Sequence, residues 1–380
     1  MDFSLSEEQE LYQQEFDKFC QKKIAPNARA IAENPKVFKE NYKALAEIGY
    51  LSAHIPESLG GEDLELPTIG FAHELLAKYC ASSFLSAGAS IGLFGNPIAS
   101  FGSKEQKDKI IPALMNADLI GCLAITEPGI GSDVASTKTT AKKVGDKYIL
   151  NGEKAMITNA PIADYAVVVA KTDPDASYAG FTQFLVDLNQ AGIERSKPYN
   201  KLGLRGSPTG GFVLKDVELS EADIVGSIGG GFLQTMQVLE FGRIGMTFFS
   251  IGIAQAAMEA AIKYSSEREA FGRPIQKFQA IHFKIADMQI EIQAARAMAL
   301  RVASMKQSGE ALGDLASIAK LYSSEVAVRA ADNSLQIHGG WGYTDDYDIE
   351  RYYRDARLGP IGEGSSEIQR ELISRMMIGS

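Results

Sequence analysis

The chain is poor in the residues that bind metals and form disulfides. Its 380 residues include only four histidines and three cysteines. The cysteines, Cys20, Cys80 and Cys122, lie far apart and form no CxxC pair, so we expect buried thiols in a reducing compartment. His73 begins a zinc-helix pattern, but Ala77 stands where its second histidine is needed. Metal-dependent chemistry therefore has no support.

Basic charge and long apolar runs are also scarce. The 38 basic and 48 acidic residues give a net charge of 38 − 48 = −10, which argues against general affinity for nucleic acid or an anionic membrane surface. No uninterrupted apolar run approaches the roughly 18 residues of a membrane span, and the N-terminal MDFSLSEEQELYQQ lacks a signal-peptide pattern. We expect a cytoplasmic protein with no membrane span, although a processed mitochondrial form would look the same.

Two motifs of nucleotide and hydrolase chemistry are missing as well. The glycines of GSIGGGF (226–232) miss the G-x-G-x-x-G spacing and lie in no βαβ unit, so we interpret them as a lead-in to a helix. No G-x-S-x-G elbow supports a serine hydrolase. The chemistry of this chain has to come from other residues.

The residues that are present divide the chain into three parts. A length of 380 residues exceeds what one core usually holds, and 45% hydrophobic with 23% charged residues is an ordinary globular composition. Residues 6–117 have helical patterns, with capping boxes that begin at Ser6 and Ser103, each answered by Gln three residues later. Within them, the small residues of SAGASIGLFG (86–95) fit either close helix packing or space for a ligand.

Between residues 121 and 228 the pattern changes to short β-rich runs separated by turn residues. The runs are YAVVVAKT (165–172), FTQFLVDL (181–188), GFVLKDVEL (211–219) and KYILNGEK (147–154), the last with an expected Asn-Gly turn. No helical segment of about ten residues separates most of these runs. An antiparallel sheet or barrel is therefore favoured over a doubly wound parallel sheet.

From residue 229 onward the pattern is helical again. A stripe of apolar residues, alternately four and three apart, is typical of a long helix that buries one seam in a bundle or a subunit interface; its members are Ile281, Ile285, Met288, Ile292, Ala295, Ala299 and Val302. The predicted fold class is α+β multidomain. It comprises an N-terminal helical domain (1–120), a central antiparallel β-barrel or sheet domain (121–228) and a C-terminal four-helix-bundle domain (229–380).

The segment LAITEPGIGSDVAS (123–136) combines turn-forming residues and hydroxyls directly after an apolar run. Its glycines permit close backbone approach to a ligand, and Thr126 and Ser132 offer hydrogen-bond donors to a flavin or a phosphate. The alternative is a plain surface loop. The loop alone leaves both interpretations open.

This loop resembles the signature of the acyl-CoA dehydrogenase family, and six more blocks recur in that family's order. They are MITN (156–159), KLGLRGSPTG (201–210), EFGR (240–243), SEREAFGRPIQKFQA (266–280), QIHGGWGY (336–343) and GEGSSEIQR (362–370). The resemblance covers essentially the whole chain, with matching length and the same α, β, α order. It implies the acyl-CoA dehydrogenase fold and an FAD-dependent enzyme that removes two hydrogens across the α,β bond of an acyl-CoA thioester.

The resemblance also implies which residues hold FAD. Thr158 matches the family's flavin donor, and Met156 stands where an aromatic residue is usual. The adenine and pyrophosphate end is held largely by a neighbouring subunit in this family, which implies a homo-oligomer and, by the family norm, a homotetramer. Arg268 is the expected phosphate ligand there; without the resemblance it would be an ordinary surface cation. The expected FAD contacts are Leu123, Ile125, Thr126, Gly131, Ser132, Met156, Ile157, Thr158, Arg268, Phe271, Gln279, Gln336, Gly339, Gly340, Ser365 and Glu367.

Oxidation of an acyl thioester requires a base for the α-proton. A carboxylate in a dry site has a pKa raised toward neutrality, and two hydrogen bonds to the thioester carbonyl stabilise the developing enolate. Glu363, between Gly362 and Gly364, matches the catalytic base of the family's main branch, whereas a minority branch has its base at the position of Gly242. Without the resemblance, Glu363 would be interpreted as a cap of the last helix.

The resemblance also implies how the acyl-CoA is held. We expect substrate contacts at Ser132, Glu240, Arg243 and Gly364. Straight-chain relatives commonly have a bulky aromatic residue immediately before the base, where this chain has Gly362. Together with Met156 and the small residues 86–95, this predicts room for a branched or cyclic acyl group, unless the space is refilled by Phe84, Leu93 or Phe94.

Two other functions fit the same scaffold. One is a flavin-dependent oxidase, which passes electrons to oxygen; its nitroalkane-oxidising members use Asp as the base. The other is a non-catalytic flavin-binding relative, for which an extra basic C-terminal domain is the expected marker of nucleic-acid association. For a dehydrogenase, the expected electron acceptor is an electron-transferring flavoprotein, and no nucleic-acid partner is expected.

Overall fold

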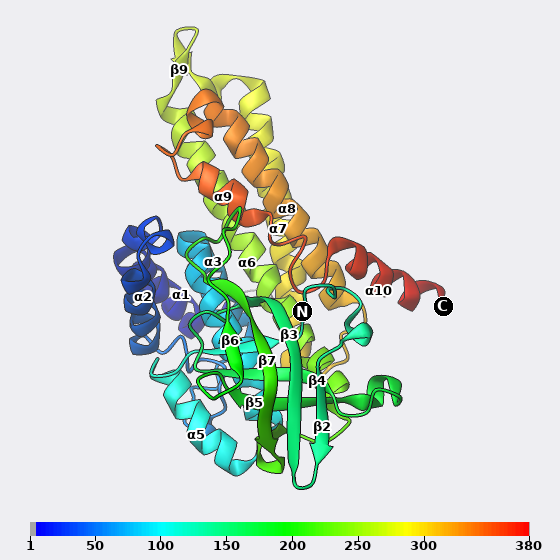
Figure 1. Ribbon diagram of the computed structural model, residues 1–380. Coiled ribbons are helices and arrows are strands. Elements are labelled where there is room, and N and C mark those ends of the chain that lie inside the picture. Colours follow the sequence, from blue (N-terminus) through cyan, green and yellow to red (C-terminus); the bar gives the residue numbers. More distant parts are fainter. Residues whose placement is uncertain (1–4, 380) are drawn as a thin grey trace.

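The first part of the protein is helical, as the sequence predicts. The computed structural model describes residues 5–379 (Figure 1). Both predicted capping boxes are confirmed, because Ser6 and Ser103 each accept a hydrogen bond from the backbone N–H three residues on and donate their own N–H to the Gln side chain there. A π-helical turn, Ala89–Gly95, joins the third and fourth helices. The helices are α1 (Glu7–Phe19), α2 (Pro35–Glu47), α3 (Leu66–Gly88), α4 (Asn96–Phe101) and α5 (Lys104–Met115).

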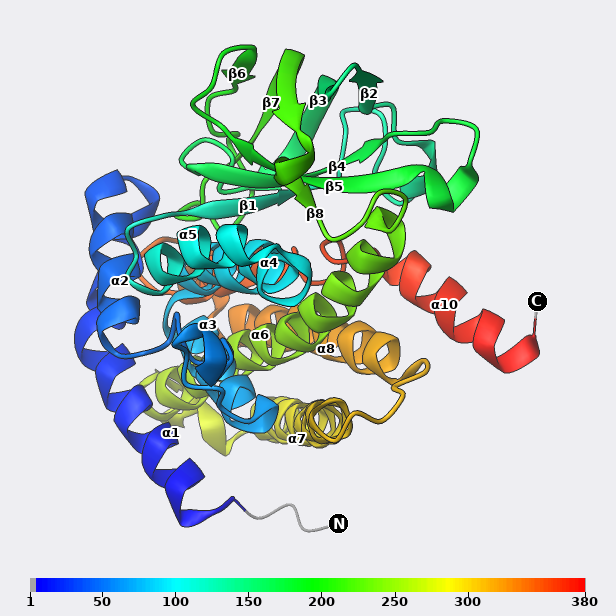
Figure 2. The same ribbon diagram turned by 90° about the horizontal axis from the view of Figure 1, so that it is seen from below.

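The second part is one sheet that lies against the helices (Figure 2). Its strands follow the order β6-β7-β3-β2-β4-β5-β8, with β1 paired to β4. Most pairs are antiparallel as predicted, but β1 and one residue of β2 pair with β4 in parallel. The strands are β1 (Gly121–Ala124), β2 (Thr140–Val144), β3 (Lys147–Thr158), β4 (Tyr165–Lys171), β5 (Phe181–Asp187), β6 (Ile193–Arg195), β7 (Thr209–Ser220) and β8 (Ile224–Val225).

The predicted Asn-Gly turn is wrong, because Asn151 and Gly152 lie inside β3. The pairing of β3 with β7 shifts register between Leu150 and Gly152, which marks an irregularity of the bulge type. Asn151 exchanges two hydrogen bonds with Asp216 of β7, at 3.1 and 2.9 Å. These long-range bonds override the local turn preference. The hairpin turn of β2 and β3 lies instead at Gly145, whose φ is +63°.

The third part consists of long helices that extend away from the sheet (Figure 1). A small hairpin of β9 (Glu269–Ala270) and β10 (Arg273–Pro274) lies at the tip where the first of these helices ends. In the predicted apolar stripe, Ile281 and Ile285 are partly buried, and the buried members are Met288, Ile292, Ala295, Ala299 and Val302. The helices are α6 (Gly231–Glu267), α7 (Gln279–Gln307), α8 (Leu315–His338), α9 (Ile349–Ala356) and α10 (Ser366–Ile378).

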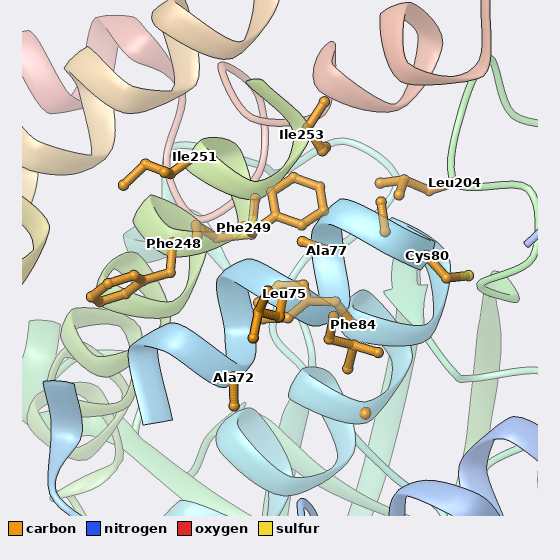
Figure 3. Close-up of a cluster of buried hydrophobic side chains, with 14 of the residues drawn as sticks. Ala72, Leu75, Ala77, Cys80, Phe84, Leu204, Phe248, Phe249, Ile251 and Ile253 are labelled. Atoms are coloured by element: carbon orange, nitrogen blue, oxygen red, sulfur yellow. The ribbon is translucent and has the colours of Figure 1, made fainter. Parts of the chain in front are cut away.

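The main core joins the first and third parts through α3 and α6 (Figure 3). Phe84 of α3 and Phe249 of α6 stack with ring centroids 5.2 Å apart. By length and composition, residues 66–101 and α6 are apolar enough to cross a membrane, yet 61% and 78% of their most apolar windows are buried inside the protein. Their apolar residues are thus largely those of core helices. The three cysteines are free and buried, as predicted.

Candidate active site

Glu363 lies in the turn that joins α9 to α10. Its φ is +53°, a left-handed conformation that is uncommon for a residue with a side chain, and Gly364 follows with φ +89°. Gln369 of α10 stabilises this turn, because its Nε2 donates to the carbonyls of Glu363 and Gly364 at 3.0 and 3.1 Å. Strained backbone held in this way is common at functional sites.

One oxygen of the Glu363 carboxylate is buried in the protein, although the residue as a whole is only partly buried. Its Oε2 is buried and has no hydrogen-bond partner within residues 5–379. Burial raises the pKa of Glu363 to about 7, although Arg243 and Lys320 act to lower it. A carboxylate with this pKa is close to half ionised at neutral pH and can accept a proton from a weak carbon acid.

Glycine at position 242 of α6 leaves the space that this carboxylate occupies. A Cβ at Gly242 would lie 2.6 Å from Glu363 Oε2 and 3.0 Å from Leu93 Cδ2. Leu93 of the π-helical turn is therefore a neighbour of the Glu363 side chain. A larger residue at position 242 would displace one of the two.

Arg243 and Glu240 lie on the same helix as Gly242, and their side chains differ in their partners. The Nε of Arg243 is buried and has no partner in the described part of the chain, and burial lowers the pKa of this guanidinium. Glu240 forms an ion pair with Lys306 of α7. Arg243 is thus the cation with an unused donor next to Glu363, whereas the carboxylate of Glu240 is already engaged.

The loop after β1 carries several of the predicted FAD residues and is pinned by a buried ion pair. Lys154 of β3, which is fully buried, donates to Glu127 Oε1 at 3.0 Å and to the carbonyl of Ile125 at 2.9 Å. Glu127 also accepts the backbone N–H groups of Lys138 and Thr139. The pair thereby closes the loop on itself and attaches it to β3.

The end of β3 lies beside this loop. The N–H of Ala155 donates to the carbonyl of Thr126 at 3.0 Å, which brings the predicted blocks at 123–136 and 156–159 together. Met156 has φ +57° and an exposed fraction of 67%, so this long side chain is held at the surface by a strained backbone. Leu123 and Ile157 are buried, Ile125 and Thr158 are partly buried, and Gly131 and Ser132 are exposed in the loop.

A second group of predicted residues lies far from Glu363. A hollow of about 550 Å³ brings together Arg268, Gly339 and Gly340, with Tyr264 and His338 among its other walls. Three other predicted residues do not line the hollow. Phe271 is 95% exposed at the tip between β9 and β10. Gln279 begins α7, and Gln336 is exposed near the end of α8. Arg268 and Arg243 are separated by 25 residues along α6, which corresponds to roughly 38 Å.

Ser365 and Glu367 lie at the beginning of α10. The hydroxyl of Ser365 accepts the N–H of Ile368 at 3.4 Å, so this residue caps the helix. Glu367 is exposed, and bonds from its own N–H and from Ser365 lower its pKa. These local bonds account for both residues without a ligand.

Two residues of the Glu363 environment, Lys320 and Gln369, were missed from the sequence. Lys320 is fully buried on α8, and its Nζ donates to the carbonyl of Gly364 at 2.6 Å. A signal for Lys320 exists, because it falls on the face of α8 formed by Ala316, Ala319 and Ser323, where small residues predict burial. A lysine on such a face requires a partner.

Comparison with known proteins identifies the family. The chain matches the models of the acyl-CoA dehydrogenase N-terminal domain over residues 6–118, middle domain over 122–217 and C-terminal domain over 229–378. The chain therefore belongs to the acyl-CoA dehydrogenase family, whose members are FAD-dependent oxidoreductases that act on acyl-CoA.

Individual relatives agree with this assignment over their full lengths. The chain is 38% identical to a probable acyl-CoA dehydrogenase, YngJ, of Bacillus subtilis (strain 168), over 100% of both chains. It is 37% identical to a 3-(aryl)acrylate reductase of Clostridium sporogenes (strain ATCC 15579), over 98% of this chain and 99% of that one.

Solved structures show the same fold. The chain is similar to butyryl-CoA dehydrogenase from Megasphaera elsdenii, with a TM-score of 0.94, 35% identity and 100% of both chains covered. A chain in a structure described as the electron transferring flavoprotein of Acidaminococcus fermentans has a TM-score of 0.95 at 36% identity, again over 100% of both chains.

Proposed function

We propose that the protein converts an acyl-CoA thioester to the 2-enoyl-CoA, with Glu363 as the base that removes the α-proton. The observation that carries this proposal is the buried Oε2 of Glu363, which has no partner within residues 5–379, together with a pKa raised to about 7 by burial. An ordinary structural carboxylate is paired or exposed. A carboxylate left without a partner in a dry site is suited to accept a proton from a bound substrate.

The thioester carbonyl requires hydrogen-bond donors while the α-proton leaves. The backbone N–H of Glu363 makes no hydrogen bond to another group in the described chain, so it is free to donate to this oxygen. A donor and a base on one residue place both functions at adjacent atoms of the substrate.

The residues around the loop and β3 fit the flavin end of FAD, which supplies the hydride acceptor when bound. Open space adjoins Gly131, since a Cβ there would meet no atom within 4 Å. Thr126 and Thr158 offer donors, and the strained, exposed Met156 lies next to them. We assign the flavin contacts of the chain to this region, with Ser365 and Glu367 at the beginning of α10 as further contacts.

The hollow near the tip fits the opposite end of FAD. Gly339 and Gly340 are open to a ligand, because a Cβ on either would meet nothing within 4 Å, and the exposed Arg268 offers a fork of donors for phosphate. Roughly 38 Å of helix separates this hollow from the Glu363 region, which is longer than a bound dinucleotide. We therefore infer that two chains share each FAD, and the family resemblance extends this to a homotetramer.

We further propose how the CoA arm and the electrons are handled. Arg243 has an unused buried donor, and we assign Ser132, which is exposed in its loop, and Gly364, which follows Glu363, as further contacts of the substrate. Glu240, which is paired with Lys306, is a further proposed contact of the CoA arm. The likeness to a chain from an electron-transferring flavoprotein structure supports such a flavoprotein as the electron acceptor.

For the acyl group we propose a branched or cyclic chain. A Cβ at Gly362 would be in ordinary contact with Leu358, at 3.5 Å, so the backbone there has room for at least a methyl group. Phe84 packs on His73 and Phe249, and Phe94 lies under Gly121, so neither is free to refill that space. A relative named for acrylates that carry an aryl group supports a ring-bearing substrate.

The test of the base is Glu363→Gln. The amide keeps the shape of the side chain but cannot take up the α-proton, so flavin reduction by acyl-CoA falls by about 10²-fold or more, within the range for a lost general base. Stopped-flow bleaching of the FAD-loaded variant measures it, with the visible spectrum as a check on cofactor content. Glu240→Gln is the control, and at saturating acyl-CoA it retains most of the rate, because loss of a substrate contact weakens binding rather than proton removal. The assignment is wrong if Glu363→Gln is reduced at the parent rate while Glu240→Gln is inactive.

A further inference from the structure

A fully buried lysine lies beside the candidate base without a carboxylate partner. Lys320 has no exposed surface, and its Nζ donates to the backbone carbonyl of Gly364 at 2.6 Å. Within residues 5–379, no carboxylate lies within ion-pair distance of it, in contrast to the buried Lys154, which is paired with Glu127. Burial of an unpaired ammonium costs free energy, so its retention requires a compensating interaction.

The hydrogen bonds of Lys320 and Gln369 meet on one turn. Glu363 and Gly364 both have positive φ, at +53° and +89°, and their carbonyls are directed toward the interior. Gln369 donates to both carbonyls from α10, and Lys320 donates to the Gly364 carbonyl from α8. Two helices thus fix the backbone that carries the base.

The charge of Lys320 also interacts electrostatically with the carboxylate of Glu363. The other charged groups around Lys320 are Arg243 of α6 and the exposed Glu367 of α10. Burial lowers the pKa of Lys320 to about 8, with Glu363 acting in the opposite direction. Lys320 is therefore still mostly protonated at neutral pH, and its positive charge favours the ionised form of Glu363.

We propose that Lys320 is a positioning residue for dehydrogenation, whose ammonium fixes the Glu363–Gly364 turn from α8 and favours the ionised form of the Glu363 carboxylate. The proposal rests on the proposed role of Glu363 as base. It assigns a function to a charge that fold stability alone does not explain, since an apolar residue would fill the same place on α8 without the desolvation cost.

The direction of the pH effect follows from the charges. Glu363 acts as a base only when ionised, so the rate of flavin reduction rises with pH through its pKa of about 7. Removal of the Lys320 charge removes one of the two groups that lower this pKa. The pKa of Glu363 then rises further, and the acid limb of the rate profile moves to higher pH.

The experiment compares Lys320→Met with Gln369→Met in the FAD-loaded enzyme. Met matches Gln in length and is one atom shorter than Lys. Lys320→Met removes one hydrogen bond to the turn and Gln369→Met removes two, but only the first removes a charge. We expect Lys320→Met to shift the acid limb of stopped-flow bleaching upward by about one pH unit and to lower the rate at pH 6 about tenfold. Gln369→Met lowers the rate at all pH values and leaves the limb in place.

Lys320→Arg is the rescue variant, since it restores the charge and a donor and is expected to return the limb toward the parent position. Infrared titration of the Glu363 carboxyl band, identified by its loss in Glu363→Gln, gives the same shift without turnover. An unchanged limb and carboxyl titration in Lys320→Met overturns the proposal.

Other outcomes separate the inference from the function it rests on. Lys320→Met and Lys320→Arg could lose FAD and thermal stability equally, with no shift of the acid limb in the protein that remains active. Lys320 then has a merely structural role, and the proposal is overturned. If Lys320→Met does not fold, Lys320→Gln and Lys320→Arg decide by the same titration. A parent enzyme that no acyl-CoA bleaches refutes the proposed function itself, and the inference falls with it.

Discussion

At the scale of single residues, Gly242 and Gly362 differ in how they affect the surroundings of Glu363. Gly242 makes room for the carboxylate, because a Cβ there would lie 2.6 Å from Oε2. Gly362 has no such contact, because the atoms nearest to a Cβ there belong to Leu358, at 3.5 Å or more. Position 242 therefore excludes a side chain while the Glu363 carboxylate keeps its place, whereas position 362 tolerates a methyl group and is the position that we propose to shape the acyl pocket.

Substitution of Gly362 by Tyr tests the proposed substrate class. A tyrosine before the base fills the space that we assign to a branch or ring. We expect kcat/KM for isobutyryl-CoA and cyclohexanecarboxyl-CoA to fall about 10- to 100-fold relative to butyryl-CoA, since steric differences of this kind correspond to about 1–3 kcal/mol. Gly362→Ala adds only a methyl group in ordinary contact and serves as the control, with the parent ranking retained.

A preference for straight chains would contradict the proposed substrate class. If butyryl- or octanoyl-CoA is the best substrate of the parent and Gly362→Tyr leaves the order unchanged, the space beside Glu363 is filled by another side chain. Leu93 is the candidate for this, because it already lies against the Gly242 position. Leu93→Ala in the Gly362→Tyr background then tests whether room returns.

The roles of residues are only partly predictable from the sequence. Glu363 was predicted by the resemblance of its block, but its burial and its pKa depend on Gly242 and Arg243, more than 100 residues earlier in the chain. Lys320 was not predicted, because the bond that its ammonium donates goes to a backbone carbonyl, and no side-chain pattern marks a carbonyl acceptor. Contacts of this kind depend on how helices approach one another.

At the scale of elements, the loop 125–139 depends on the Lys154–Glu127 pair. Burial lowers the pKa of Lys154 to about 8. Burial by itself raises the pKa of Glu127. Lys154 and three hydrogen bonds from Lys138 and Thr139 outweigh this effect and hold the pKa of Glu127 below its ordinary value. The carboxylate is therefore ionised when the loop is closed. Lys154 is then required to keep the loop closed, because it compensates the buried charge of Glu127.

Lys154→Met is expected to destabilise the protein by about 3–5 kcal/mol, because it leaves the charge of Glu127 buried without its partner. The loop also opens, so FAD is bound less tightly. Lys147→Met is the matched control, since Lys147 lies on the same strand and pairs with Glu218, but at the exposed surface; little change is expected there. Chemical denaturation and FAD titration measure both effects. Equal stability of the two variants contradicts the role given to the buried pair.

The elements themselves were predicted well where the signal is local. The capping residues Ser6 and Ser103 and the four named β-rich runs lie where predicted. The Asn-Gly turn failed because Asn151 exchanges hydrogen bonds with Asp216, 65 residues away. The parallel pairing of β1 with β4 also escaped prediction, since strand order is set by contacts between distant segments rather than by local pattern.

At the scale of the whole molecule, α6 connects the two halves of the proposed FAD site. Arg243 lies near its beginning, beside Glu363, and Arg268 follows its last residue, at the hollow with Gly339 and Gly340. The order of helical and β-rich parts was predictable from the sequence. The distance between the two half-sites was not, because it depends on α6 being one uninterrupted helix. If two chains share one FAD, defects in the two half-sites complement each other.

Mixed assemblies of Arg268→Ala and Glu363→Gln chains test this sharing. Arg268→Ala removes a charge-assisted phosphate contact worth about 1.5–3 kcal/mol and weakens FAD binding, whereas Glu363→Gln removes the base. In a mixed pair, the site on the Arg268→Ala chain keeps its own Glu363 and receives the intact Arg268 of its neighbour. An equal mixture therefore recovers about a quarter of the parent rate, since half of the pairs are mixed and each has one complete site of two.

The rate is measured at an FAD concentration that leaves Arg268→Ala alone mostly empty. Glu363→Gln chains mixed with chains that carry both substitutions have no base and give the background. Recovery no greater than the activity of Arg268→Ala alone means that each chain holds its own FAD, and the shared site is then excluded.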